Sequence, residues 1–365
     1  MPLSSLETFG DISKLKVGDT IDNFNGHLIC EKYIPKSNKR TGRPTDGNKT
    51  RQKKDPIAPL FMEHADTSQL AYNLGAFKPG DEIEITLKMH GTSQRTAYVP
   101  VLKGYKRTFW DWLFRRPGKP IYEYGYVSGT RRTILNDYEG GFYGSNAFRK
   151  QHADQFEGKL GKGETVYYEV VGFTDTGAPI MGDCQNKKLN DKDFVKQYGD
   201  ITRFSYGCKP TVSIDCDDLQ SDLYVYRMTM TNEDGDVVEY TPDFMRYRCE
   251  QMGVKCVPVF AKGQILVNNC EQPYINYHNY TTGANSLISI TNVGECVQYV
   301  AEQYYDGPDP IGKSHVREGV VVRIINRPKF TAYKHKNFSF KCLEGIVKAD
   351  AEAPDMEEAQ EIDNA

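Results

Sequence analysis

The sequence is built from short runs of β-branched and aromatic residues separated by turn residues. In the run EIEITLK (82–88), Ile83, Ile85 and Leu87 alternate with polar residues, which is the period-2 pattern of a half-buried strand. Further strand-like runs are YYEVVGF (167–173), LYVYRMTMT (223–231), DVVEYT (236–241), VKCVPVF (254–260) and GVVVRII (319–325). The segments TPDFMRYRCEQMG (241–253) and GECVQYVAEQYYD (294–306) have helical spacing. Many short strands with few helices predict an α+β fold of antiparallel sheets rather than a doubly wound parallel sheet.

The length and composition favour a globular chain with a main domain and an accessory region. The chain has 365 residues, of which 39% are hydrophobic and 26% charged, which excludes collagen-like, fully disordered and coiled-coil chains. We expect a small β-rich accessory region at residues 1–60 and a main domain at 61–345. Residues 350–365 carry seven acids and no base, and we expect residues 346–365 to form an acidic, disordered tail.

The sequence has neither a membrane-spanning run nor a cysteine motif for metal. No stretch approaches ~18 consecutive apolar residues, and the start, MPLSSLETFGD, has no apolar signal segment. We therefore expect a cytoplasmic protein without membrane contact, acting as a monomer. The nine cysteines are scattered without a CxxC pair, so we expect free thiols rather than zinc ligands or disulfides.

A basic loop precedes the main domain. Residues 36–54 contain eight basic residues and one acid, Asp46, among Gly, Pro, Asn and Thr residues. Such a stretch is either a solvated loop or a contact surface for the phosphate backbone of a nucleic acid. On the second interpretation, the contacting residues are Lys49, Arg51, Lys53 and Lys54.

Both tryptophans lie in one segment, TFWDWLFRRPGKP (108–120). We interpret this basic segment as a surface insertion with an aromatic anchor. Trp110 and Trp112 either pack in the core or stack on bases.

Four short motifs contain residues suited to phosphate chemistry. Lys88 ends the EIEITLK strand and is followed by Gly91, whose missing side chain lets the backbone approach a ligand phosphate. Two acids, Glu169 and Glu318, lie in apolar runs, where a carboxylate is costly to bury without a hydroxyl, a cation or a metal. Two further lysines, Lys334 and Lys336, are two residues apart in TAYKHKNFSFK, so they share one face of a strand and favour an anion between them.

The order and spacing of these motifs resemble the covalent nucleotidyltransferase superfamily of RNA ligases, DNA ligases and mRNA capping enzymes. The resemblance covers residues 60–345, in which KMHGTS, SGTRRT, YYEVVGF, LYVYRM, REGVVVRI and YKHKNFSF are similar to six family motifs in their family order. The KxHG and lysine-x-lysine forms are most similar to RNA-repair and bacteriophage RNA ligases. In DNA ligases and capping enzymes an OB domain follows the last motif, whereas too few residues follow Phe338 here to form one.

The resemblance implies a nucleotidyltransferase domain of antiparallel sheets with flanking helices, and a role for each matching residue. Lys88 becomes adenylylated, with Gly91 beside the nucleotide, and Arg131 or Arg132 contacts the sugar or a phosphate. Glu169 binds the ribose and Tyr226 stacks on adenine. The divalent metal, Mg²⁺ or Mn²⁺, is held by Glu318. The ATP phosphates are bound by Lys334 and Lys336.

The implied activity is an ATP-dependent RNA ligase that joins 5′-phosphate and 3′-hydroxyl ends. A lysine with an ordinary pKa of about 10.4 is protonated at neutral pH, so we expect nearby cations and desolvation to favour loss of its proton. Two alternatives remain: a ligase of the same superfamily that joins DNA or RNA/DNA hybrid nicks, and a nucleic-acid-binding protein that kept the fold without the chemistry. The substrate ends are not encoded in any short motif.

Overall fold

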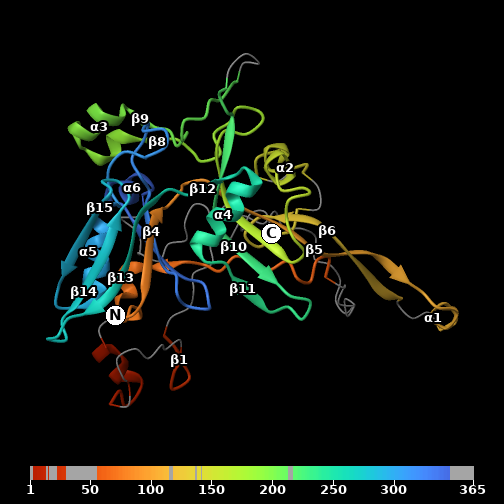
Figure 1. Ribbon diagram of the computed structural model, residues 1–365, viewed down its shortest axis with the longest axis horizontal. Helices are drawn as coiled ribbons and strands as arrows, with labels where there is room; N and C mark the ends of the chain where they lie inside the picture. Colours follow the sequence, from red (N-terminus) through yellow and green to blue (C-terminus); the bar gives the residue numbers. More distant parts are fainter. Residues whose placement is uncertain are drawn as a thin grey trace.

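The protein is an α+β fold whose strands form two large, mainly antiparallel sheets (Figure 1). A computed structural model describes residues 3–13, 15, 23–29, 56–114, 118–135, 138–140, 142–212 and 217–345. The basic loop at 36–54, with Lys49, Arg51, Lys53 and Lys54, and the acidic tail at 346–365 lie outside the described residues.

The first sheet has seven strands in the order β15-β14-β13-β4-β16-β17-β3. Its pairs are antiparallel except for β17 with β3. The strands are β3 (Ser68–Gln69), β4 (Glu82–Leu87), β13 (Val259–Val267), β14 (Pro273–Asn279), β15 (Ala284–Ser289), β16 (Gly319–Ile324) and β17 (Thr331–Lys336).

The second sheet has six strands in the order β11-β10-β7-β5-β6, with β12 parallel to β10. Its strands are β5 (Thr92–Lys106), β6 (Lys119–Gly129), β7 (Glu164–Gly172), β10 (Ser221–Thr231), β11 (Val237–Glu239) and β12 (Lys255–Cys256). Two small ribbons pair β1 (Asn23–Phe24) with β2 (His27–Leu28), and β8 (Cys184–Gln185) with β9 (Ile201–Thr202).

Short helices connect the strands and cover the sheets. The α-helices are α1 (Phe109–Leu113), α2 (Ala147–Asp154), α3 (Lys192–Tyr198), α4 (Pro242–Met252), α5 (Val293–Glu302) and α6 (Phe338–Leu343). The 3₁₀ helices are η1 (Leu3–Phe9), η2 (Leu70–Tyr72), η3 (Leu74–Ala76) and η4 (Asn186–Leu189). None of the helices described is long and apolar enough to cross a membrane.

The two predicted helices and the predicted strand EIEITLK are confirmed. Thr241 caps the start of α4 by accepting the Phe244 N–H, and Gly253 ends the helix in a left-handed conformation (φ +70°). In β4, Ile83 and Ile85 are buried as expected, but Glu84 on the opposite face is also buried. The polar face of β4 thus lines an internal pocket instead of facing bulk solvent.

A main core and smaller clusters hold the fold together. The main core combines apolar residues of both sheets, including Ile85 and Val322 of the first and Val170 and Val225 of the second. A separate cluster packs Ala58 and Phe61 against residues of β5 and β6, and the boundary expected at residue 60 lies within this segment. The described cysteines are free thiols.

The proposed core packing of the tryptophans is wrong. Trp110 and Trp112 lie in α1 at the far end of the β5–β6 hairpin (Figure 1) and are 63% and 66% exposed. The strand pair is long enough to carry them beyond the body of the protein.

Candidate active site

Lys88 lies directly after β4, where the strand runs between β13 and β16. Its backbone N–H donates to the carbonyl of Gly319 at 3.0 Å, which fixes the end of β4 against the start of β16. The side chain is largely buried, and Nζ lies 2.7 Å from Oε1 of Glu318. The candidate nucleophile therefore has a fixed backbone and a carboxylate against its ammonium group.

Glu318 is a buried carboxylate surrounded by cationic and imidazole groups. It is 1% exposed, and Oε1 also lies 3.1 Å from Nζ of Lys336, while Oε2 lies 3.5 Å from Nδ1 of His90. Burial alone would raise the pKa of Glu318, but Lys88, Lys336 and a hydrogen bond with His90 outweigh it and lower this pKa to about 2. Glu318 is therefore a carboxylate at neutral pH.

A second buried acid, Glu344, contacts the other side of Lys336. Its Oε2 lies 3.0 Å from Lys336 Nζ, and its Oε1 lies 4.0 Å from Nδ1 of His90. Asn337 starts α6 by accepting the N–H groups of Ser339 and Phe340, and this short helix places Glu344 directly after its last residue. Lysines and acids thus alternate along the row Lys88, Glu318, Lys336, Glu344.

The glycines near Lys88 are required by close backbone approach. A Cβ on Gly319 would lie 2.1 Å from the carbonyl oxygen of His335, and the residue has a φ of +147°. A Cβ on Gly91 would lie 2.4 Å from the carbonyl oxygen of Val170 in β7. These contacts give both glycines a packing role, while contact of Gly91 with a nucleotide stays a prediction.

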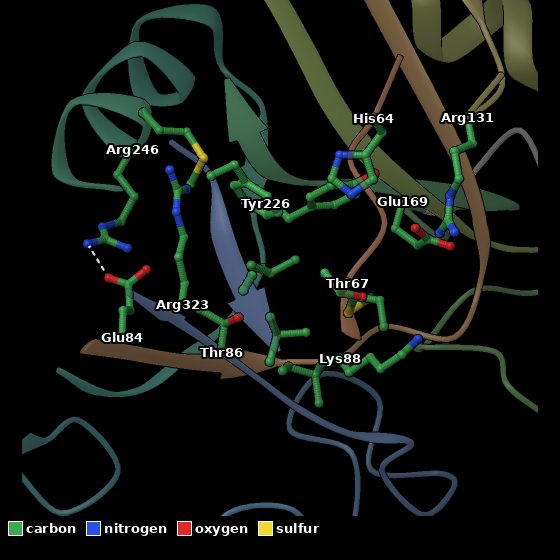
Figure 2. Close-up of a pocket in the computed structure, with 17 residues that line it drawn as sticks. His64, Thr67, Glu84, Thr86, Lys88, Arg131, Glu169, Tyr226, Arg246 and Arg323 are labelled. Carbon is green, nitrogen blue, oxygen red and sulfur yellow. Dashed lines mark hydrogen bonds and ion pairs between the residues drawn. The ribbon is translucent and has the colours of Figure 1, made fainter. Parts of the chain in front are cut away.

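A pocket of about 810 Å³, including the space at its open mouth, lies between the two sheets beside Lys88. Figure 2 shows two groups of side chains at its ends. Lys88, Arg131 and Glu169 lie toward one end, and Glu84, Arg246 and Arg323 toward the other. The pocket therefore joins the candidate nucleophile to a second group of charged side chains at its other end.

Tyr226 reaches this pocket from a bulge in β10. The register of β10 against β7 shifts between Val225 and Arg227, so Tyr226 is the extra residue of the bulge. Bulges turn side chains away from the regular alternation and are common beside active sites. The Tyr226 hydroxyl is 3.0 Å from Oγ of Ser93, which holds its ring at the pocket wall.

His64 lies against the Tyr226 ring, and the sequence interpretation did not include it. The two ring centroids are 5.1 Å apart in an edge-to-face contact. Burial, together with the charges of Arg227 and Arg131, holds the pKa of His64 well below its usual 6.5. The neutral imidazole has its Nδ1 3.2 Å from Nη1 of Arg227, which donates to it.

The sequence interpretation also missed three charged residues at the end of the pocket away from Lys88, namely Glu84, Arg246 and Arg323. Arg246 pairs with Glu84 at 2.8 Å, and Arg323 donates from Nη2 to the carbonyl of Tyr240 at 3.1 Å. The Arg323 Nε is buried with no hydrogen-bond partner in the described part of the chain. Residues two apart on a strand point to the same face. Thr86 and Val321 line the pocket, Glu84 is two residues before Thr86, and Arg323 is two residues after Val321. Alternation along these two strands could therefore have indicated Glu84 and Arg323.

The two candidate arginines differ in position. Arg131 lines the pocket and its side chain is 13% exposed, whereas Arg132 is not among the lining residues and its side chain is 52% exposed. Both contact Asp66, at 3.3 Å and 3.1 Å. Arg131 is thus the one of the two that faces the pocket.

The remaining candidates have mixed positions. Glu169 lines the pocket beside Arg131. Lys336 meets Lys88 through Glu318. Lys334 pairs in register with Val321 on the neighbouring strand but is not among the residues lining the pocket. The structure therefore brings Lys88, Arg131, Glu169 and Tyr226 together and places Glu318 and Lys336 directly behind Lys88.

The metal predicted at this site is assigned to Glu318. Among the described residues, no group of three or more His, Cys, Asp or Glu side chains forms a metal site. Mg²⁺ commonly keeps several waters and binds one or two carboxylates together with substrate phosphates. The carboxylate of Glu318 is ionised, but its Oε1 pairs with Lys88 and Lys336 and it is not among the residues lining the pocket, so metal binding by Glu318 stays a prediction.

Comparisons with known proteins give distant likenesses in structure. No protein-family model matches the chain, and no curated protein sequence matches it. A variant of Naegleria gruberi RNA ligase with ATP and Mn is similar to it at a TM-score of 0.43 and 14% identity, over 93% of this chain and 70% of that chain. The same ligase with PPi gives a TM-score of 0.40 and 13% identity, over 81% of this chain. The chain spans 63% of the length of that PPi-bound ligase.

Proposed function

We propose that this protein is an ATP-dependent RNA ligase that joins 5′-phosphate and 3′-hydroxyl ends through a lysyl-AMP intermediate on Lys88. The position of Lys88 carries the proposal. The lysine lies at one end of a pocket between two sheets, with Glu318 and Lys336 directly behind it. An amine fixed at the end of a pocket, with the further cation Lys336 close by, is suited to attack on phosphorus, where positioning and charge supply most of the rate.

The pocket offers a complementary group for each part of a nucleotide. The Tyr226 ring provides a face for a base, and the buried Nε of Arg323 offers a donor to an acceptor atom of that base. Glu169 suits ribose hydroxyls, and Arg131 suits a phosphate. This order directs the α-phosphate toward Lys88.

Three displacements at phosphorus follow. The neutral Nζ of Lys88 attacks the α-phosphorus of ATP, the bond to pyrophosphate breaks, and the lysine proton passes to solvent. An oxygen of the strand's 5′-phosphate then attacks the phosphorus of lysyl-AMP, and the bond between that phosphorus and Nζ of Lys88 breaks. Finally the 3′-hydroxyl attacks that 5′-phosphate, loses its proton and releases AMP.

The chain's own residues prepare the first step. The Glu318 carboxylate at 2.7 Å favours the ammonium form of Lys88, so Lys88 must lose a proton before it attacks. Arrival of phosphates beside Lys336 gives that cation a new partner. When bound to Glu318 and the nucleotide, Mg²⁺ or Mn²⁺ supplies charge neutralisation at the phosphate oxygens.

Transfer of radiolabel tests the proposal. Incubation with α-labelled ATP should label the protein, and addition of strands with 5′-phosphate and 3′-hydroxyl ends should release the label as AMP and yield sealed product. All-RNA, all-DNA and mixed nicks then separate an RNA ligase from a DNA or hybrid ligase. A protein that binds strands but takes no label is a binding protein and contradicts the proposal.

A further inference from the structure

The β5–β6 hairpin projects from the second sheet as a two-stranded finger. β7 pairs with β5 only from Thr92 to Ala97, whereas the β5–β6 pairing continues to Lys106 and Lys119. We call the part of β5 and β6 beyond Ala97, together with α1, the finger. Figure 1 shows it running away from the body to α1 at its end. Two-stranded ribbons are only marginally stable alone, so stability of the fold does not explain why this one projects from the body, and a binding role would.

The tip of the finger exposes large aromatic side chains. Phe109, Trp110, Trp112 and Phe114 are each at least 59% exposed. A capping box between Thr108 and Asp111 forms the turn, so polar backbone capping and not a buried core shapes the tip. Contiguous exposed apolar patches on soluble proteins commonly mark binding sites.

Basic side chains flank these aromatics. Lys103, Lys106, Arg107 and Lys119 are exposed along the finger. The acids of the same described stretch are Asp111, which is engaged in the capping box, and Glu123. Aromatic faces interleaved with cations complement bases and phosphates of a nucleic acid strand.

Tyrosines also lie at the base of the finger, where they are half-buried and where Tyr98 and Tyr126 pack against the main core. Tyr98 and Tyr126 are stacked with ring centroids 4.8 Å apart, and Lys162 lies 4.8 Å from the centre of the Tyr124 ring. The same strand begins beside the pocket, where Ser93 contacts Tyr226. At roughly 3.3 Å per residue, the 15 residues of β5 span about 50 Å. One continuous strand thus connects the candidate active site to the tip.

We infer that the aromatic tip of the finger binds unpaired bases of the nucleic acid substrate, by stacking on Trp110 and Trp112, while the neighbouring cations bind its phosphates. This inference rests on the proposed ligase function, which supplies a polynucleotide reaching beyond the pocket. A lipid surface is the competing partner for aromatic and basic side chains. The cations spread along the finger favour a polymer that follows the ribbon over a membrane met by the tip alone.

The two tryptophans of the chain are both at the tip, so intrinsic tryptophan fluorescence reports on this site alone. Titration with a 30-nucleotide oligo(U) should quench the emission, as stacking on a base does. Vesicles of phosphatidylcholine with 30% phosphatidylserine should leave the emission maximum unchanged. A blue shift with vesicles and no quenching by oligo(U) overturns the inference in favour of a membrane-binding tip.

Fluorescence anisotropy of labelled oligo(U) tests the contribution of the tip to affinity. Trp110→Ala with Trp112→Ala should weaken binding at least about fivefold, since each stacked base contributes on the order of 1 to 3 kcal/mol. Tyr280→Ala, which removes an aromatic that is 51% exposed on the other sheet, is the matched control and should change little. Unchanged affinity in the double variant overturns the inference.

Lys88 adenylylation measured on the same proteins separates this inference from the proposed function. Because the tip is far from the pocket, the double variant should form lysyl-AMP at the wild-type rate. If oligo(U) quenches the emission of a wild-type protein that forms no lysyl-AMP, the result supports nucleic-acid binding by the tip and contradicts the proposed ligase function. If lysyl-AMP forms normally, but oligo(U) does not quench the emission and the double variant keeps its affinity, the inference about the tip is wrong and the proposed ligase function is unaffected.

Discussion

Lys88 and Lys336 share one oxygen atom of a buried carboxylate: their Nζ atoms lie 2.7 Å and 3.1 Å from Oε1 of Glu318. Two ammonium groups so close together repel each other unless an anion lies between them. Glu318 provides that anion. A phosphate oxygen has the same charge sign and acceptor character, so the pair is prepared to receive one.

Glu318→Gln should abolish adenylylation while leaving a folded protein. The amide keeps the size of the side chain but removes the charge between the lysines and is a poor ligand for Mg²⁺. We expect the rate of lysyl-AMP formation to fall by at least about 100-fold, the loss seen when one electrostatic stabiliser is removed from an active site. Label incorporation from α-labelled ATP measures it.

Glu164→Gln is the matched control for that variant. Glu164 is also buried, but it pairs with Arg248 at 2.8 Å and accepts from Tyr240, whereas Glu318 pairs with Lys88 and Lys336. Loss of either buried carboxylate should cost about 3 to 5 kcal/mol of unfolding free energy. Near-normal adenylylation in Glu318→Gln would favour a purely structural role for Glu318.

Arg131→Ala and Arg132→Ala should differ strongly in ATP affinity. Arg131 faces the pocket, and loss of a charged hydrogen bond to phosphate should weaken ATP binding about 10- to 100-fold. Arg132 is half-exposed outside the pocket, so its removal should change the Kd less than about threefold. Isothermal titration with ATP on the Lys88→Ala background isolates binding from reaction, and equal losses would contradict the assignment.

The stability of the protein should depend on Glu318 in acid. Its pKa is about 2 in the folded protein and 4.5 ordinarily. The folded state therefore binds fewer protons than the unfolded state, so this contribution is complete above pH 4.5 and is lost as the pH falls toward 2. Urea unfolding at a series of pH values measures the unfolding free energy. Between pH 4.5 and pH 2 this free energy should fall further in the wild type than in Glu318→Gln, by on the order of 3 kcal/mol. Parallel curves would show that Glu318 is not held by the lysines.

The basic loop should contribute to strand binding and not to adenylylation. Reversal of Lys49, Arg51, Lys53 and Lys54 to Glu removes up to four phosphate contacts, each releasing roughly 0.7 to 0.9 of a counterion. The slope of log affinity against log salt should flatten by about 2 to 3 units, with sealing slowed most at low salt. Equal loss of adenylylation and sealing would place the loop in the nucleotide site or the fold, and no change in either would make it a solvated loop.

The strands and helices were predictable because local patterns decide them. Ile83, Ile85 and Leu87 alternate, and α4 has both its Thr241 cap and its terminal Gly253 in the sequence. The exposure of Trp110 and Trp112 was not predictable in this way, since large aromatics are normally buried. The two tryptophans are exposed because β5 continues beyond the end of its pairing with β7. The extent of strand pairing is a tertiary property, which local sequence patterns do not give.

The candidate site was predictable where residues belong to motifs and not elsewhere. Lys88 and Glu318 follow from the motifs. Glu344 had no signal, because only the turn at Asn337 and the short α6 bring it to Lys336. His64 lies in an irregular segment without periodicity, so its contact with Tyr226 depends entirely on tertiary packing.

Mass spectrometry of the protein after incubation with ATP and Mg²⁺ tests the central claim most directly. The account predicts one added AMP, located on Lys88 by peptide mapping, released by pyrophosphate, and missing in Lys88→Ala. An adduct that persists in Lys88→Ala, or a wild-type protein that binds ATP in the pocket without forming any adduct, would contradict it.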